Sequence, residues 1–234
     1  MMKYQRIREQ LLSEIMTGAF TMGENFPSEN AVADRFSVSR MTARRALVEL
    51  EQQGYLTRIP GRGNILKKPS FSQGFFTVKP FKTYAEENAA QPSTQVLCAE
   101  LRVLPQEGQD KLAAKRGIFV HRLRSLDDEV VVEEKRYLNY ELCAAMLKED
   151  LEVQSIHDLL IHKFKLPLTK VWQKLSAVVL EPEKAALFHC PEAAPAFLLE
   201  RVTYTFEEPV TWVKYWMRGD RYQFENEFVP QEQS

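Results

Sequence analysis

Residues 39–50 read SRMTARRALVEL, and this stretch decides the architecture of the first third of the chain. Its small and apolar side chains recur at i, i+3, i+4 and i+7 as Ala43, Ala46, Leu47 and Leu50, which predicts a helix from about residue 40 to 53 with one buried face. The opposite face carries Met41, Arg44, Arg45, Val48 and Gln52, with Thr42 at its edge. The stretch therefore predicts a helix whose Ala and Leu face is buried and whose opposite face presents arginines to the solvent.

The segments around this helix predict a winged helix-turn-helix. A first helix is expected over residues 4–17, and a short second helix from Ser28 to about Phe36, because Pro27-Ser28-Glu29 is typical of a capped helix start. Ser39 is placed to cap the third helix in the same way. Two short strands, 55–58 and 64–67, flank the turn Pro60-Gly61-Arg62-Gly63 and predict a small hairpin.

This order of elements predicts contacts with duplex DNA. Side chains near the start of a recognition helix reach base edges in the major groove, and here they are Arg40, Met41, Thr42, Arg44 and Arg45. The helix starts at Ser28, Glu29 and Ser39 offer backbone N–H groups to phosphates. Arg62 lies between Gly61 and Gly63, an arrangement that suits an arginine entering the minor groove. The alternative for any single arginine is a solvated helix face.

The same residues resemble the DNA-binding domain of the GntR family. The resemblance rests on Pro27-Ser28-Glu29, on the segment from Ser39 to Leu47 and on Gly61-Arg62-Gly63, and it covers residues 3–68 without a gap. It implies that Arg40, Thr42, Arg44 and the Gly61–Gly63 turn contact DNA. Family members often have glutamine after the arginine that corresponds to Arg44, so Arg45 is expected to adjust operator preference here.

Charge and composition agree with a basic head on an acidic body. Residues 1–68 contain eleven Lys or Arg and seven acids, a net charge of +4, whereas the remainder contains twenty bases and 25 acids, a net charge of −5. Only the head is therefore expected to meet a polyanion. The three scattered cysteines predict reduced thiols in the cytoplasm, and the sequence predicts neither a membrane segment nor a secretory signal.

The remaining chain predicts an α+β domain. We expect domain bounds of 1–68 for the winged helix-turn-helix, 69–79 for a linker and 80–234 for the second domain. Strands are expected at 94–104, 117–126, 130–138, 168–180, 196–206, 209–217 and 221–228, and helices at 82–90, 105–115, 140–149, 154–163 and 181–189. Tight polar turns between several strands favour an antiparallel sheet with helices on one side.

Polar residues on the predicted sheet indicate an effector-binding pocket. Arg122 and Arg124 lie two residues apart and share one face of a strand, and Glu134 follows the next turn, where it can meet Arg124. Two guanidiniums can grip an anionic or polyhydroxylated ligand, and the alternative is a simple cross-strand ion pair. Ser155 opens a helix, either as a plain N-cap or beside an anion. Three further candidates are Lys82 and Thr83, at another helix start, and Tyr222, which otherwise packs on the sheet.

The second domain resembles the UTRA domain of the HutC subfamily, whose fold is shared with chorismate lyase. Three segments carry the resemblance: Arg122–Arg124 with Glu134–Leu138, Ser155–Leu160, and Pro209-Val210 with Arg218–Phe224. The resemblance implies a small-molecule effector near Glu134, and repression is the family default. HutC relatives as a group respond to urocanate, amino sugar phosphates, sugars and other small metabolites, and the arginine pair favours an anion.

Other chemistry is not indicated. The four histidines do not form a zinc pattern, and no P-loop, Gly-x-Gly-x-x-Gly or Gly-x-Ser-x-Gly segment occurs, so neither a metal nor a cofactor is expected. The favoured function is a regulator that binds a palindromic operator as a homodimer, because one helix-turn-helix reads only a few base pairs. The alternatives are a lyase-like enzyme with an accessory DNA-binding head and a constitutive architectural DNA-binding protein.

Overall fold

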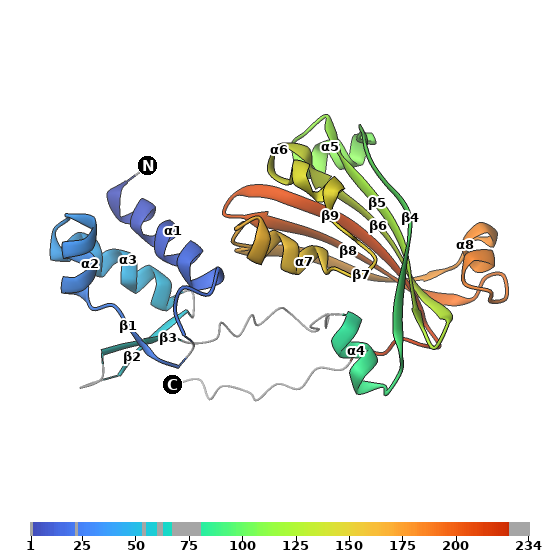
Figure 1. The fold of residues 1–234 in the computed structure, drawn as a ribbon, viewed down its shortest axis with the longest axis horizontal. Helices are drawn as coiled ribbons and strands as arrows, with labels where there is room; N and C mark the ends of the chain where they lie inside the picture. Colours follow the sequence, from blue (N-terminus) through green and yellow to red (C-terminus); the bar gives the residue numbers. More distant parts are fainter. Residues whose placement is uncertain (1, 22, 53–54, 60–62, 67–80, 225–234) are drawn as a thin grey trace. The chain divides into compact units, whose positions relative to one another are not determined.

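The structure is a computed structural model that describes residues 2–21, 23–52, 55–59, 63–66 and 81–224 (Figure 1). The chain forms two compact units. The head holds the elements from α1 to β3 together with Leu160–Leu168, and the body holds the remaining described residues. Each unit is described by itself.

The head is a winged helix-turn-helix, as predicted. Its helices are α1 (Lys3–Met16), α2 (Glu29–Phe36) and α3 (Arg40–Gln52), and its strands are β1 (Asn25–Phe26), β2 (Leu56–Ile59) and β3 (Gly63–Leu66). The strands form an antiparallel sheet in the order β1-β3-β2, and β1 was not predicted. The apolar side of α3 packs with α1 and α2, since Ala43, Leu47, Leu50, Leu11 and Val32 are all buried.

Short capping contacts fix the turn between α2 and α3. The Ser28 hydroxyl accepts a hydrogen bond from the Ala31 N–H at 3.2 Å, and the Ser39 hydroxyl accepts one from the Thr42 N–H at 3.2 Å. Ser37 ends α2 in the left-handed region with a φ of 50°. Both helix starts are therefore held by their own side chains, which sets where the outward face of α3 begins.

The body is an antiparallel six-stranded sheet with helices, the α+β fold that was predicted. Its strands are β4 (Pro92–Val103), β5 (Arg116–Leu126), β6 (Glu129–Asn139), β7 (Lys170–Val179), β8 (Pro195–Thr205) and β9 (Glu208–Arg218). Their order is β4-β5-β6-β9-β8-β7. The sheet thus consists of two three-stranded meanders, and the pairing of β6 with β9 joins them.

Helices cover both faces of this sheet, rather than one as predicted. They are α4 (Phe81–Glu87), α5 (Gln106–Leu112), α6 (Tyr140–Cys143) with η1 (Ala144–Lys148), α7 (Ile156–Asp158), and α8 (Pro182–Leu187). The helix η2 (Leu159–Lys163) follows α7 and belongs, from Leu160 on, to the head unit. We call the face that bears Arg122 and Glu134 the inner face and the face that bears His121 and Glu133 the outer face. Tyr84 of α4 packs toward the inner face, whereas α5 and α8 lie against Trp212 and Trp216 of the outer face.

One predicted strand is wrong, and two predicted segments lie outside the described residues. Residues 221–224 do not form a strand, because the chain turns after β9 and the Tyr222 N–H donates to the Arg218 carbonyl at 2.9 Å. Residues 225–228 of that prediction and the linker predicted at 69–79 lie outside the described residues. The domain bounds 1–68 and 80–234 stay predictions.

Candidate functional site

The outward face of α3 is organised by one carboxylate on α2. Glu29 accepts a hydrogen bond from Arg40 Nε at 2.9 Å and one from Arg58 Nη2 on β2 at 2.7 Å, and Arg44 Nε lies 3.8 Å from the same carboxylate. The Glu29 side chain is only 13% exposed, whereas those of Arg40 and Arg44 are 69% and 54% exposed. The carboxylate is therefore tucked beneath three guanidiniums that still face outward.

This arrangement keeps a net positive charge on the face. The hydrogen bond from Arg40, opposed by partial burial and assisted by Arg58, holds the pKa of Glu29 below its ordinary value. One ionised carboxylate faces three cations, so the group carries a net charge of +2. Because long arginine side chains lose rotamer freedom when they bind, holding them in advance lowers the cost of contact with a polyanion.

The other predicted DNA-contacting residues divide into two groups. Ser28, Ser39, Met41 and Thr42 lie at the starts of α2 and α3, and Met41 is exposed. Arg45 does not join the Glu29 group, because its guanidinium lies 3.9 Å from the centre of the Tyr4 ring on α1.

The tip of the wing is described only in part. Gly63 begins β3 with a φ of 84°, a left-handed conformation that favours glycine, and Gly61 and Arg62 lie outside the described residues. Sequence reasoning missed Arg58. Its position on the first strand of the predicted hairpin was the available signal.

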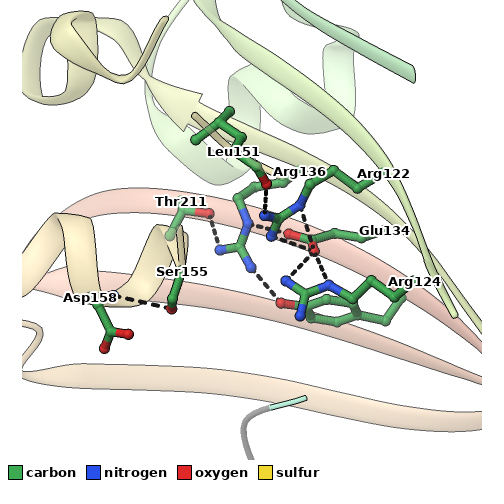
Figure 2. A network of polar contacts seen from close by, with 9 residues as sticks. Arg122, Arg124, Glu134, Arg136, Leu151, Ser155, Asp158 and Thr211 are labelled. Atoms are coloured by element: carbon green, nitrogen blue, oxygen red, sulfur yellow. Dashed lines mark hydrogen bonds and ion pairs between the residues drawn. The ribbon is translucent and has the colours of Figure 1, made fainter. Parts of the chain in front are cut away.

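On the inner face of the body, three guanidiniums converge on Glu134, as Figure 2 shows. Glu134 Oε2 accepts from Arg122 Nη2 at 2.7 Å and from Arg124 Nε at 3.1 Å, and its Oε1 accepts from Arg136 Nε at 2.7 Å. We call these four residues the arginine cluster. The predicted contact of Glu134 with Arg124 is present, and Glu134 also binds Arg122, which is directly opposite it in the register.

The cluster reaches backbone and side chains beyond the two strands. Arg122 Nη1 donates to the Leu151 carbonyl at 2.9 Å, which ties the segment after η1 to the inner face (Figure 2). Arg136 Nη1 donates to the Thr211 hydroxyl at 3.1 Å and its Nη2 to the Tyr215 hydroxyl, both on β9. The cluster therefore lies across the junction of β6 and β9, where the two meanders meet.

Burial and charge oppose each other in this cluster. Burial acts to raise the pKa of Glu134, but Arg122, Arg136 and Arg124 overcome it and hold that pKa far below its ordinary value. Burial lowers the pKa of Arg122, yet arginine stays protonated near neutral pH. Three cations around one anion leave a net charge of +2 in a buried place. Neither the arginines nor Glu134 can exchange a proton near neutral pH, so the cluster suits binding rather than acid–base catalysis.

The remaining predicted effector residues are only partly gathered there. Ser155 caps α7, its hydroxyl accepting from the Asp158 N–H at 3.3 Å (Figure 2). Tyr222 is buried and stacks on Tyr84 of α4 with 4.2 Å between ring centres, and Arg124 is near enough to act on its pKa. In the described part of the chain, no hydrogen bond or ion pair joins Lys82 or Thr83 to the cluster. Their neighbour Phe81 does lie there, 5.2 Å from the Arg124 guanidinium.

Sequence reasoning missed Arg136, Thr211 and Tyr215. Arg136 had a signal, because it lies two residues after Glu134 and therefore on the same face of the strand. Thr211 and Tyr215 had none, since the sequence does not say that the sixth strand of the body pairs with the third.

A second ionic group lies on the outer face. Glu133 Oε1 lies 2.8 Å from His121 Nε2 and 3.3 Å from Lys135 Nζ, and Glu133 Oε2 accepts from Lys184 Nζ at 2.5 Å. Although burial acts to raise it, these partners lower the pKa of Glu133 to about 2. Its partners lie on the sheet and on α8, so this group fastens α8 to the outer face.

Membrane-spanning helices and metal-binding clusters were both absent from the described residues. Within the described ranges, no helix has both the length and the apolar character needed to cross a membrane. The same residues contain no cluster of three or more His, Cys, Asp or Glu side chains arranged to hold a metal ion.

Comparison with known proteins agrees with both units. Residues 3–65 match the family described as bacterial regulatory proteins, gntR family, and residues 87–223 match the UTRA domain. The transcriptional repressor NagR of Bacillus subtilis is 29% identical over 94% of this chain and 92% of its own length. The histidine utilization repressor of Pseudomonas putida is 27% identical over 96% and 91%.

Solved structures show the same fold. PhnF from Mycobacterium smegmatis aligns with a TM-score of 0.59 at 21% identity, covering 96% of this chain and all of that one. The family and these relatives are transcription regulators and not enzymes. With a GntR head and a UTRA body, each in its expected place along the sequence, the chain belongs to the HutC subfamily of the GntR family of bacterial transcription regulators.

Proposed function

We propose that this regulator is a repressor that acts in the cytoplasm as a homodimer, binds a palindromic operator through its two heads, and leaves it when a small anionic or polar metabolite binds the body. Relatives that match along nearly the whole chain are named as repressors, which supports the sign of the regulation. A symmetric dimer fits because one head reads only a few base pairs and two heads read a palindrome.

The observation that carries the DNA-binding part is the Glu29 group. Arg40 and Arg44 are held at the start of α3 yet remain more than half exposed, which is the arrangement that base contacts in the major groove require. Arg58, on β2, adds a third cation beside them. Ser28, Ser39 and Thr42 would hold phosphates, and Gly61–Gly63 would follow the minor groove.

Arg45 and Glu29 receive different roles in this proposal. Arg45 is stacked on Tyr4, so we expect it to brace α3 against α1 more than to read bases. Glu29 would not bind DNA itself, because a carboxylate facing phosphates is repelled. Its part is to hold Arg40 and Arg44 in position.

The arginine cluster supports the effector part of the proposal. Its net charge of +2 is buried, and burying charge that is not fully compensated costs several kcal/mol. An anion bound there would supply the compensation. By linkage, an effector that binds better to the arrangement of the dimer that does not fit the operator would release the DNA.

The DNA-binding part is tested with an operator selected from a random duplex pool by the purified full-length protein. Fluorescence anisotropy at about 150 mM salt then measures how tightly this operator is bound by the wild type, by R40A/R44A and by the matched double variant R6A/R35A. Arg35 is paired with Glu14 and Arg6 lies on α1, so the second variant removes two cations of the same unit away from α3. We expect R40A/R44A to weaken binding at least about 30-fold and R6A/R35A by less than about 3-fold, since each good base contact contributes roughly 1–3 kcal/mol.

The role of Glu29 is separated by the isosteric variant E29Q. Because it keeps every cation and removes one anion, we expect E29Q to bind unrelated duplex at least as tightly as the wild type does, with about 10-fold weaker binding to the operator from the lost positioning. Equal operator affinity of wild type, R40A/R44A and R6A/R35A would reject the DNA-binding proposal. A loss shared by operator and unrelated DNA in E29Q would reject the positioning role alone.

A further inference from the structure

Beside the arginine cluster lies a fourth guanidinium that has no acidic partner among the residues the structure describes. Arg201 is on β8, and its Nη2 donates to Gln173 Oε1 on β7 at 3.0 Å. Its Nε is buried and has no hydrogen-bond partner within the described residues. No carboxylate of the described chain pairs with it. Arg201 as a whole is partly buried, and a partly buried guanidinium without an anion is still unfavourable, since buried polar atoms such as its Nε are normally satisfied.

The register places Arg201 in one row with Arg136. Arg136 on β6 is opposite Val213 on β9, and Val213 is opposite Arg201 on β8. The three side chains therefore share the inner face, and the two arginines are separated only by one valine. Long side chains on strands that are two spacings apart, roughly 10 Å, readily reach the same place above the residue between them.

The electrostatics agree with this placement of the two arginines. Burial lowers the pKa of Arg201, Tyr215 opposes this, and the nearby charge of Arg136 lowers the pKa further. Tyr215 also accepts a hydrogen bond from Arg136. Two like charges thus lie in one row of the inner face, and no carboxylate of the described residues pairs with Arg201.

We propose that Arg136 and Arg201 form a second anion-binding subsite, so that the effector is a small metabolite with two acidic groups. This inference rests on the proposed function, in which the first acidic group binds near Arg122 and Arg124. The row of Arg136 and Arg201 lies two residues along the strands from the row of Arg122 and Glu134, a spacing of roughly 7 Å. That spacing suits two acidic groups on a skeleton of three or four carbon atoms.

The bonding supports a subsite rather than a structural ion pair. Arg136 already gives one N–H each to Glu134, Thr211 and Tyr215, which fixes its plane and leaves N–H groups on both terminal nitrogens. Arg201 is held by Gln173 and keeps its Nε free. A carboxylate or phosphate between the two arginines would accept from both and cancel one of the uncompensated charges.

The test compares two probes that differ by one acidic group. Glycerol 3-phosphate and 3-phosphoglycerate are titrated by calorimetry into the full-length protein, the variant R201M and the control K174M. Lys174 is exposed on β7 and faces the opposite side of the sheet from Gln173, so K174M removes a cation of the same meander without touching the cluster. We expect wild type and K174M to bind 3-phosphoglycerate at least about 10-fold more tightly than glycerol 3-phosphate, and R201M to lose that difference.

Several results would overturn the inference. Equal affinity of the wild type for both probes, an equal loss of both probes in R201M, or binding of neither probe would each contradict a second subsite. If a metabolite with one acidic group, or with none, releases the operator, the proposed function is supported but the second subsite is contradicted.

A second measurement needs no ligand. If Arg201 is kept for an anion, R201M removes an unpaired and partly buried charge, and the melting temperature of the free protein should rise by about 2–4 °C, with K174M unchanged. A lower melting temperature or failure of R201M to fold would show that Arg201 serves the fold, and would overturn the inference.

Discussion

Replacing Glu134 by glutamine tests how the arginine cluster is balanced. Its side chain is 0% exposed and bonds three guanidiniums at 2.7–3.1 Å, so E134Q leaves three buried cations with no anion. Removing one partner from a buried ionic group costs about 3–5 kcal/mol. For a domain of 150–250 residues, each kcal/mol lowers the melting temperature by roughly 2–4 °C, so we expect a fall of about 6–20 °C.

The melting temperature is measured by thermal unfolding, followed by circular dichroism. The free energy of unfolding is measured separately by urea unfolding. The matched control is E207Q, since Glu207 is 90% exposed and its ion pair with Lys170 is of the kind that contributes at most about 1 kcal/mol. A loss in E134Q no larger than that in E207Q would refute the view that Glu134 neutralises the cluster.

Three further predictions concern other parts of the chain. R45A should lower the melting temperature while weakening operator binding less than R44A does, because Arg45 is stacked on Tyr4, and anisotropy with calorimetry separates the two effects. Glu133 has a folded-state pKa of about 2 against an ordinary value of 4.5, so its contribution, up to about 3 kcal/mol, is present above pH 4.5 and is lost as pH falls toward 2. Urea unfolding between pH 6 and pH 3 should therefore show a shallower decline for E133Q than for the wild type, and parallel declines would contradict this. G117A should destabilise the body by roughly 1–3 kcal/mol, because its new Cβ would lie 2.7 Å from a carbonyl oxygen on the neighbouring strand, and an unchanged urea midpoint would show that the sheet adjusts.

The head could be predicted almost completely because its signals are local. The period of Ala43, Ala46, Leu47 and Leu50 fixed α3 to within a residue, and the two capping serines lie where the sequence placed them. The two-residue strand β1 was missed, since so short a segment shows no alternation.

In the body, local pairs were predictable and the junction of the meanders was not. Arg124 and Glu134 belong to consecutive strands joined by a tight turn, so their contact could be predicted from spacing, whereas the register that sets Arg122 opposite Glu134 could not. Arg201 shares a row with Arg136 only because β9 pairs with β6, a long-range pairing that no short pattern encodes. The strand expected at 221–228 was wrong over residues 221–224 because Arg218 binds Asp220 and the chain turns there.

The junction of β6 and β9 has a consequence for kinetics. Within each meander the contacts are near in sequence, so we expect them to form early in folding. The pairing of β6 with β9 closes a longer loop and therefore costs more conformational entropy, so we expect it to form later. A metabolite that binds residues of both meanders would therefore stabilise the native state more than the transition state of folding. We expect it to prolong the lifetime of the native body while leaving the refolding rate nearly unchanged.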